Sequence, residues 1–311
     1  MAPILGIMAS GISGHLQIRA AYFAGGYDTS LISSIDKIAF SADTKSTLSA
    51  TLSTARRYLA GAANSGTAAY FAGGLDTANI SGIDKIAFSA DTKSTLSATL
   101  STARYGLAGA ANSGTAAYFA GGYDSLATSG IDKIIFSGDT KSTLAATLST
   151  ARRFLAGAAN SGTAAYFAGG VDTADISGID KIAFSADTKS TLAATLSTAR
   201  EQLAGAANSG TAAYFAGGYN SPTTSYISSI DKIAFSADTN STLSATLSTA
   251  RNNLAGAANS GTAAYFAGGS DGSYISSIDK IAFSADTKST LAATLSTARQ
   301  VLAGAANSGV I

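Results

Sequence analysis

The chain reads AAYFAGG from Ala20 to Gly26, and this stretch returns five more times within the 311 residues. Successive copies are 48 residues apart, except the last, which follows after 51. The tyrosines of the six copies are Tyr22, Tyr70, Tyr118, Tyr166, Tyr214 and Tyr265. A fixed period of this length is typical of repeat architectures, in which each unit buries its apolar surface against its neighbours.

Each repeat contains four short segments that predict strands. In the second repeat they are LAGAANSG (59–66), TAAYFAGG (67–74), IDKIAFSAD (83–91) and STLSATLS (94–101). The last two alternate between apolar and polar residues with the period of an extended chain. Turn-forming residues separate the first segment from the second and the third from the fourth. Four short strands in about 48 residues are typical of one propeller blade.

A helical alternative exists for one part of the repeat. The stretch TKSTLSATLSTARRYL (44–59) also places leucines at helical spacing, and alanine favours helices. However, serine and threonine are frequent there and disfavour helix interiors, and glycine interrupts the pattern directly afterwards. We therefore predict an all-β, six-bladed β-propeller with four antiparallel strands in each blade.

The two ends of the repeat region predict how the ring closes. No LAGAANSG precedes the first AAYFAGG, whereas an unmatched copy occupies 302–309. A C-terminal strand that joins blade 1 beside Tyr22 resolves this offset and removes exposed sheet edges. The predicted organisation is an N-terminal tail or attachment segment (1–19) and a propeller (20–311), with blades at 20–54 plus 302–309, 59–102, 107–150, 155–198, 203–249 and 254–297.

The repeat resembles the kelch motif. The resemblance covers residues 20–309 and rests on the double glycine Gly25-Gly26, the segment IAFSAD, the late arginine Arg56 and the small LAGAANSG strand. The chain departs from the motif because it has no tryptophan and carries Phe40 where kelch repeats usually have tyrosine. The resemblance implies that the first strand of each repeat lies innermost, which would place LAGAANSG around the axis.

The N-terminal stretch PILGIMASGISGHL (3–16) is similar to the openings of bacteriophage tail and virion-associated proteins. This resemblance implies a virion or extracellular location, with possible contacts to other virion proteins through that segment. No apolar run of about 18 residues occurs, so we predict no membrane span. The segment also lacks the basic start of a secretory signal.

Composition argues against several classes of chemistry. There is no cysteine, and the single histidine, His15, lies outside the repeats, so the sequence predicts no metal site, no cofactor and no catalytic triad. The net charge is +1, and 17 of the 20 lysines and arginines recur in three slots of the repeat. Without a basic stripe we expect no nucleic-acid binding. We expect the recurring Asp36 and Arg56 slots to be paired, since buried charges require partners.

The informative differences between repeats lie in two places. One is the loop after the double glycine, and the other is the pair of residues after the recurring arginine. In an antiparallel blade both places open on the same face of the disc. All eight aromatic residues outside the repeated slots fall in these two places. The candidate binding residues are Tyr27, Arg57, Tyr58, Tyr105, Tyr123, Arg153, Phe154, Glu201, Tyr219, Tyr226, Asn252, Asn253 and Tyr274.

The sequence thus predicts a non-catalytic recognition protein. Tyrosines on loops of a rigid scaffold commonly build recognition surfaces, and a glycan or a protein receptor on a cell surface suits such a face. The first-choice cluster is Arg57, Tyr58, Arg153 and Phe154, with the Tyr219–Tyr226 loop second. Two alternatives stay open: a purely structural virion component that buries this face, and a glycan-cleaving enzyme built around Glu201 and nearby aspartates.

Overall fold

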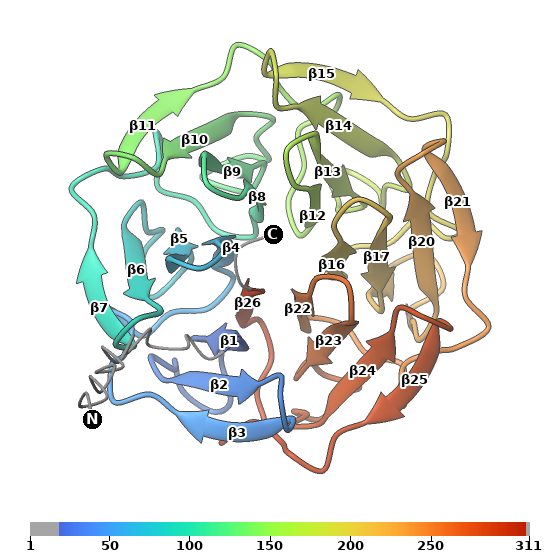
Figure 1. Cartoon of the computed structure of the whole chain (residues 1–311). Coiled ribbons are helices and arrows are strands. Elements are labelled where there is room, and N and C mark those ends of the chain that lie inside the picture. The colour runs from blue at the N-terminus through green and yellow to red at the C-terminus, as the bar shows by residue number, and fades with distance from the viewer. Residues whose placement is uncertain (1–18, 309–311) are drawn as a thin grey trace, which may run out of the picture.

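The computed structural model describes residues 19–308, which form a closed ring of six four-stranded antiparallel sheets (Figure 1). The described chain contains strands and turns but no helix. The fold prediction is therefore confirmed. The segment 1–18, with His15 and the predicted virion contacts, lies outside the described residues, as do residues 309–311.

Each blade contributes one strand to each of four concentric positions. The innermost strands are β4 (Ala60–Asn64), β8 (Ala108–Asn112), β12 (Ala156–Asn160), β16 (Ala204–Asn208), β22 (Ala255–Asn259) and β26 (Ala303–Asn307). The second strands are β1 (Ala20–Ala24), β5 (Ala68–Ala72), β9 (Ala116–Ala120), β13 (Ala164–Ala168), β17 (Ala212–Ala216) and β23 (Ala263–Ala267). The LAGAANSG segment thus surrounds the axis (Figure 1).

The third strands are β2 (Ile35–Ala39), β6 (Ile83–Ala87), β10 (Ile131–Ile135), β14 (Ile179–Ala183), β20 (Ile230–Ala234) and β24 (Ile278–Ala282). The outermost strands are β3 (Thr44–Thr47), β7 (Thr92–Thr95), β11 (Thr140–Thr143), β15 (Thr188–Thr191), β21 (Thr239–Thr242) and β25 (Thr287–Thr290). A small hairpin, β18 (Tyr219–Asn220) with β19 (Ser225–Tyr226), extends the loop of the fifth blade.

The C-terminal strand closes the ring. β26 pairs antiparallel with β1, and Tyr22 lies opposite Ala305 in that register. The first sheet therefore has the order β26-β1-β2-β3, whereas the other four-stranded sheets are each built from one continuous stretch of chain. Because strands from both ends of the described chain share one sheet, the closure couples blade 1 to the last residues of the propeller.

The core lies between the blades because both faces of each sheet are covered by neighbours. Phe71 and Ile86 of the second blade pack against Tyr22 of the first blade. Tyr70 and Ile83, on the other face of that sheet, pack in a separate cluster toward the third blade. This arrangement explains why the AAYFA strands are fully buried although they carry large residues on alternating sides.

The predicted fourth strand is wrong in position. The outer strand β7 spans Thr92–Thr95, and most of the predicted STLSATLS segment follows it as irregular chain. The predicted alternation nevertheless holds, since Leu100 is buried, Leu96 and Ala98 are half-buried and the intervening residues are exposed. The segment does not extend the strand because it turns inward, where Leu100 N donates to Ser81 O of the same blade and the Leu100 side chain packs between this blade and the next.

Buried ion pairs lock each blade to the next, as expected for the recurring arginine and aspartate. Arg56 Nη2 lies 3.2 Å from Asp84 Oδ2, and neither side chain is more than 1% exposed. The same carboxylate accepts hydrogen bonds from Ser53 and Thr95, so its charge is well satisfied. Equivalent pairs join all six blade boundaries of the described ring, and Arg299–Asp36 spans the closure.

A second set of links lies on the face that carries the turns between strands one and two and between strands three and four, which we call the constant face. Asp91 in the SADTK turn accepts hydrogen bonds from Tyr22 Oη at 2.8 Å and Lys37 Nζ at 2.7 Å. Around the axis, Ser65 N donates to Ser113 Oγ, and this pattern continues through six serines until Ser308 N donates to Ser65 Oγ.

Candidate functional site

The two variable places of the repeat meet on the face opposite the constant face, which we call the variable face. The residue directly after each recurring arginine pairs its backbone with the first residue of the loop in the following blade. Examples are Arg57 with Leu75 and Tyr105 with Tyr123, and the last of these bridges joins Gln300 to Tyr27 across the closure. The predicted shared face is therefore confirmed by geometry.

A closed ring of backbone hydrogen bonds surrounds the axis on the variable face. Tyr58 N donates to Val301 O at 2.9 Å, Gly106 N donates to Tyr58 O, and the pattern continues through all six connections. Each member has a φ between +55° and +65°, a region that is uncommon for residues other than glycine. The members of this axial ring are Tyr58, Gly106, Phe154, Gln202, Asn253 and Val301.

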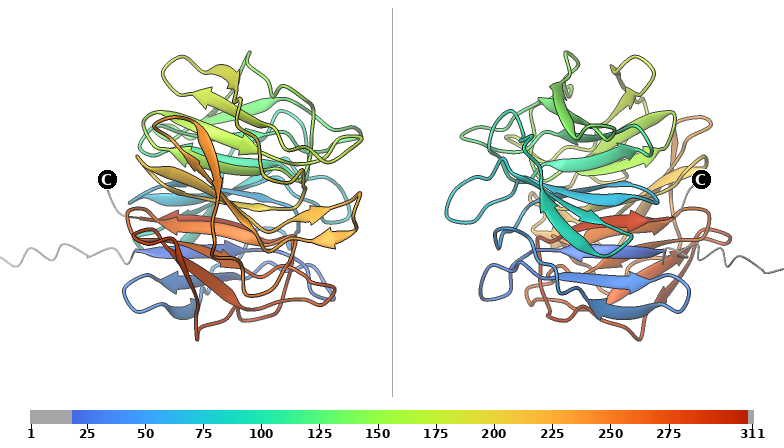
Figure 2. Two further views of the ribbon diagram at one scale, coloured as in Figure 1. Left: turned by 90° about the vertical axis from the view of Figure 1, so that its right-hand side faces the viewer. Right: turned by 60° about the vertical axis from the view of Figure 1, so that its left-hand side comes forward.

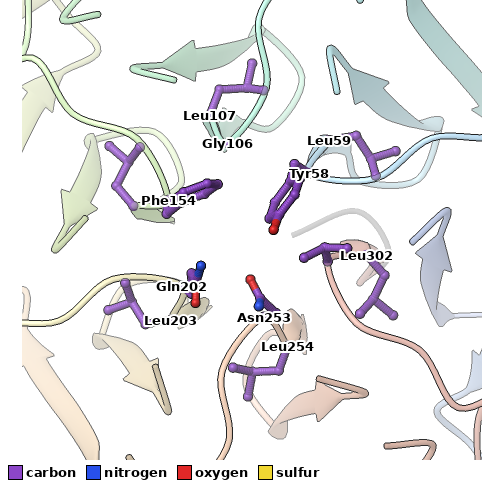
Figure 3. A pocket seen from close by; sticks show the side chains of 12 residues that line it. Tyr58, Leu59, Gly106, Leu107, Phe154, Gln202, Leu203, Asn253, Leu254 and Leu302 are labelled. Carbon is purple, nitrogen blue, oxygen red and sulfur yellow. The ribbon is translucent and has the colours of Figure 1, made fainter. Parts of the chain in front are cut away.

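Side chains of the axial ring surround a small cavity of about 80 Å³. Six leucines, one behind each ring member, complete its lining: Leu59, Leu107, Leu155, Leu203, Leu254 and Leu302. Figure 3 shows Tyr58 and Phe154 on one side of the opening and Gln202 and Asn253 on the other. The backbone is six-fold uniform here, whereas the chemistry of the side chains is not.

Aromatic rings gather on one half of the variable face. The Tyr58 and Phe154 rings are 5.0 Å apart, and Tyr105 lies 5.6 Å from Tyr58 and 5.4 Å from Tyr123. Gly106 makes the first contact possible, because a Cβ at this position would lie 2.8 Å from the Phe154 ring. The ring of Phe154 therefore lies over the neighbouring connection and meets a residue two connections away (Figure 3).

Two arginines extend this group of rings. The Arg57 guanidinium lies 5.2 Å from the centre of the Tyr27 ring and 5.6 Å from that of Tyr58. Arg153 lies in the same way over Tyr123, at 4.7 Å, and Phe154, at 5.4 Å. With Tyr274, whose ring is 6.1 Å from Tyr27, the contacts form one continuous aromatic–arginine strip: Tyr274, Tyr27, Arg57, Tyr58, Phe154, Arg153, Tyr123 and Tyr105.

The other half of the face carries amides and acids. Asn252 Nδ2 donates to Gln202 Oε1 at 2.7 Å, and Asn253 Nδ2 donates to Gln300 Oε1 at 3.2 Å. Burial raises the pKa of the Glu201 carboxyl, and the nearby charge of Asp175 raises it further, while Arg153 acts in the opposite direction. This half offers hydrogen-bonding groups in place of ring surfaces.

The second predicted cluster makes no ring contact with the strip among the described residues. Tyr219 and Tyr226 face each other across the β18–β19 hairpin, with ring centres 5.5 Å apart. This hairpin, gold in Figure 2, projects from one side of the disc. Tyr226 and Tyr274 both line a hollow of about 590 Å³ between their loops, together with Asn252 and Gln300.

The structure thus places the predicted residues in three groups. The first-choice cluster of two arginines and two aromatics comes together in the strip, joined by Tyr27, Tyr105, Tyr123 and Tyr274. Glu201, Asn252 and Asn253 lie in the opposite half, and the Tyr219–Tyr226 pair stands apart. Sequence reasoning missed Gly106, Gln202, Gln300 and Val301, although they occupy the same two slots as Tyr58 and Arg57 and were recognisable by position.

The constancy of the opposite face has a structural cause. Its SADTK turns hold the aspartates that bind a tyrosine and a lysine of the neighbouring blade, and its ANSG turns hold the serine ring. These aspartates and the serines of the ANSG turns cannot vary without loss of contacts between blades. The contrast in variation between the faces therefore does not by itself indicate binding, and the case for a binding face depends on the strip.

We also searched the described residues for metal-binding groups and membrane-spanning helices, and compared the sequence with known proteins. Within residues 19–308, no group of three or more histidine, cysteine, aspartate or glutamate side chains is arranged to hold a metal ion. The same residues contain no helix long and apolar enough to span a membrane. A scan against protein-family models finds no match for this chain, and a search of curated proteins finds no similar sequence.

Proposed function

We propose that this propeller is a non-catalytic recognition module that binds a saccharide chain, such as a cell-surface glycan, across its variable face. The observation that carries the proposal is the continuous aromatic–arginine strip beside the axial cavity. Except for the exposed Tyr274, its rings are half-buried and held by one another, so they offer contact area with little loss of side-chain freedom on binding.

Saccharides suit this face for two physical reasons. The apolar C–H faces of a pyranose ring pack against aromatic faces, which supply large apolar area with a polar tip at each tyrosine. The amides of Gln202, Asn252 and Asn253 lie across the axis and can exchange hydrogen bonds with hydroxyl groups. A chain of several sugar units would contact both halves at once.

A non-catalytic role agrees with the position of the acids. Glu201 lies on the connection next to that of Arg153 but makes no ring contact, and Asp175, whose charge raises the pKa of Glu201, accepts hydrogen bonds from Ser221. The ring contacts of the strip therefore involve no carboxylate, although Asp28 and Asp124 follow two of its tyrosines in the loops. A location on a virion or at a cell surface, suggested by the N-terminal segment, is part of the same proposal.

The proposal is tested by incubating the purified protein with an array of neutral and acidic glycans and with whole cells. We expect retention on a defined set of glycans, and loss of retention in the double variant Tyr58→Asn/Phe154→Asn. Asparagine already occupies the same slot at Asn253, so this change respects the backbone. Failure to bind any glycan, with assembly of the protein through its variable face, would favour a purely structural role.

A further inference from the structure

Arg57 and Arg153 differ from every other buried or half-buried arginine in the described chain. The six arginines of the recurring slot are each paired with a buried aspartate. Arg57 and Arg153 form no ion pair among the described residues, whereas a buried Nε without a hydrogen-bond partner is common to all eight of these arginines. Arg57 and Arg153 are therefore the two guanidinium groups on this face that have no anionic partner within the protein, and each can take one from a ligand.

The stacking of these arginines leaves their hydrogen-bonding edges free. A guanidinium that lies over an aromatic ring uses its flat face for the contact, while its five N–H groups project in the plane. Arg57 lies over Tyr27 and Tyr58, and Arg153 lies over Tyr123 and Phe154. The rings hold the two guanidinium groups in place, and the terminal Nη atoms, which are neither bonded within the described residues nor buried, remain available for an acceptor with two oxygens.

We infer that the ligand of the variable face is an acidic saccharide, whose carboxylates bind Arg57 and Arg153 while its sugar rings lie on Tyr58, Phe154 and Tyr105. This inference rests on the proposed saccharide-binding function and adds the charge of the ligand. A carboxylate fits the guanidinium fork with two parallel hydrogen bonds. The acidic sugar class includes uronic and sialic acids, which share this group.

The two arginines are not equivalent in this account. Gln202 N donates to Phe154 O, so Glu201 lies on the connection next to that of Arg153, where its carboxylate can compete with a ligand for the charge of this arginine. The connections on either side of Arg57 carry Gln300 and Tyr105 in the corresponding slot, and neither is an acid. We therefore assign the stronger carboxylate contact to Arg57, and we expect Glu201 to weaken the contact at Arg153.

The experiment compares saccharides that differ only in charge. Uronic-acid oligomers and sialylated glycans are each titrated beside their methyl-esterified forms. We expect the acidic member to bind more tightly and to weaken with added salt, which screens charges. The variant Arg57→Gln, which copies the residue of the same slot at Gln300, should lower affinity for the acidic member about tenfold or more, as for hydrogen bonds to charged groups, and should leave the esterified member unchanged.

Two further variants sharpen the result. Glu201→Gln should raise affinity for the acidic member roughly two- to fivefold by removing a competing charge. Lys93→Gln removes one positive charge from an exposed outer strand and should change nothing. Equal binding of acidic and esterified saccharides, or equal effects of Arg57→Gln and Lys93→Gln, would overturn the inference and leave saccharide binding intact. Binding of neither saccharide would overturn both.

Discussion

The two ends of the central axis are built from the same six repeats but differ in how much they vary. At the constant face, six serines form a uniform ring in which both the backbone and the side chain take part. At the variable face, the backbone alone closes the ring, so its side chains range from Gly106 to Phe154. Because the axial ring of the variable face is held by backbone hydrogen bonds, its side chains are not needed for the fold and are available for binding.

Both ends of the axis depend on closure of the ring by β26, so we expect the largest loss of stability when this strand is removed. Removing residues 302–311 deletes β26 and leaves β1 with an unpaired edge beside the axis. Because the blades share their cores, we expect loss of cooperative folding rather than local fraying, measured by thermal and chemical denaturation.

The matched control is a circular permutant. Residues 302–309 are moved to the N-terminus and joined directly to Arg19, so that blade 1 becomes continuous like the others. This variant should fold with nearly the stability of the parent. A truncated protein that melts at the parent temperature would contradict closure by β26.

Two adjacent arginines, Arg152 and Arg153, have different roles: the first stabilises the contact between blades, and the second lies on the variable face. Arg152 is 1% exposed and paired with Asp180 at 3.0 Å, whereas Arg153 has no ion pair among the described residues. Arg152→Ala should lower the free energy of unfolding by about 3–5 kcal/mol, since it leaves a buried carboxylate without its partner. Arg153→Gln should change it by about 0.5 kcal/mol or less.

Urea denaturation of the two variants measures this difference. Similar losses in both would mean that the residue after the recurring arginine also carries the scaffold. The proposed distinction between the repeated ion pairs, which stabilise the fold, and the side chains of the variable face, which do not, would then be wrong.

Alkaline pH should act through the links of the constant face. Burial and a hydrogen bond to Asp238 raise the pKa of Tyr166 to about 12. The phenol is therefore more readily ionised in the unfolded chain, where its pKa is about 10. Stability from this group is complete below pH ~10 and is lost as the pH rises through about 12.

Unfolding curves recorded between neutral and strongly alkaline pH, together with the ultraviolet absorbance of the phenols, test this prediction. We expect ionisation of the scaffold tyrosines to coincide with unfolding. Their ionisation near the ordinary tyrosine pKa in a folded protein would contradict the burial and hydrogen bonds described for the constant face.

Much of the propeller scaffold was predictable because the same sequence pattern occurs in all six repeats. The period, the unmatched LAGAANSG and the recurring charges fixed the blades, the closure and the Arg–Asp pairs. The outer strand was misplaced because its alternation continues into irregular chain, where Leu100 is buried by the next blade rather than by strand pairing.

The candidate site was predictable only in part. Position in the repeat identified the two variable slots and the face they share. The left-handed backbone of the axial ring could not be read from residues as different as Tyr58, Asn253 and Val301. Nor could the contact between Tyr58 and Phe154, since it joins connections that are not neighbours and depends on the absent side chain of Gly106.

A small effect on stability is also expected at the centre of the strip. In Tyr58→Asn/Phe154→Asn, ring contacts worth about 0.5–1.5 kcal/mol each are lost. Asparagine adopts positive φ more readily than tyrosine or phenylalanine, which offsets part of that loss. We expect unfolding free energy to change by about 1 kcal/mol or less, because strain at such positions is of similar size.

The most direct test of separate scaffold and recognition roles is to measure glycan affinity and melting temperature on the same two double variants. Tyr58→Asn/Phe154→Asn alters the variable face, and Ser89→Lys/Ser137→Lys places two charged side chains on exposed turns of the constant face. We predict that both variants melt close to the parent and that only the first loses binding, by tenfold or more if these rings are dominant anchors. Loss of binding in the constant-face variant, with binding retained in the first, would contradict the account.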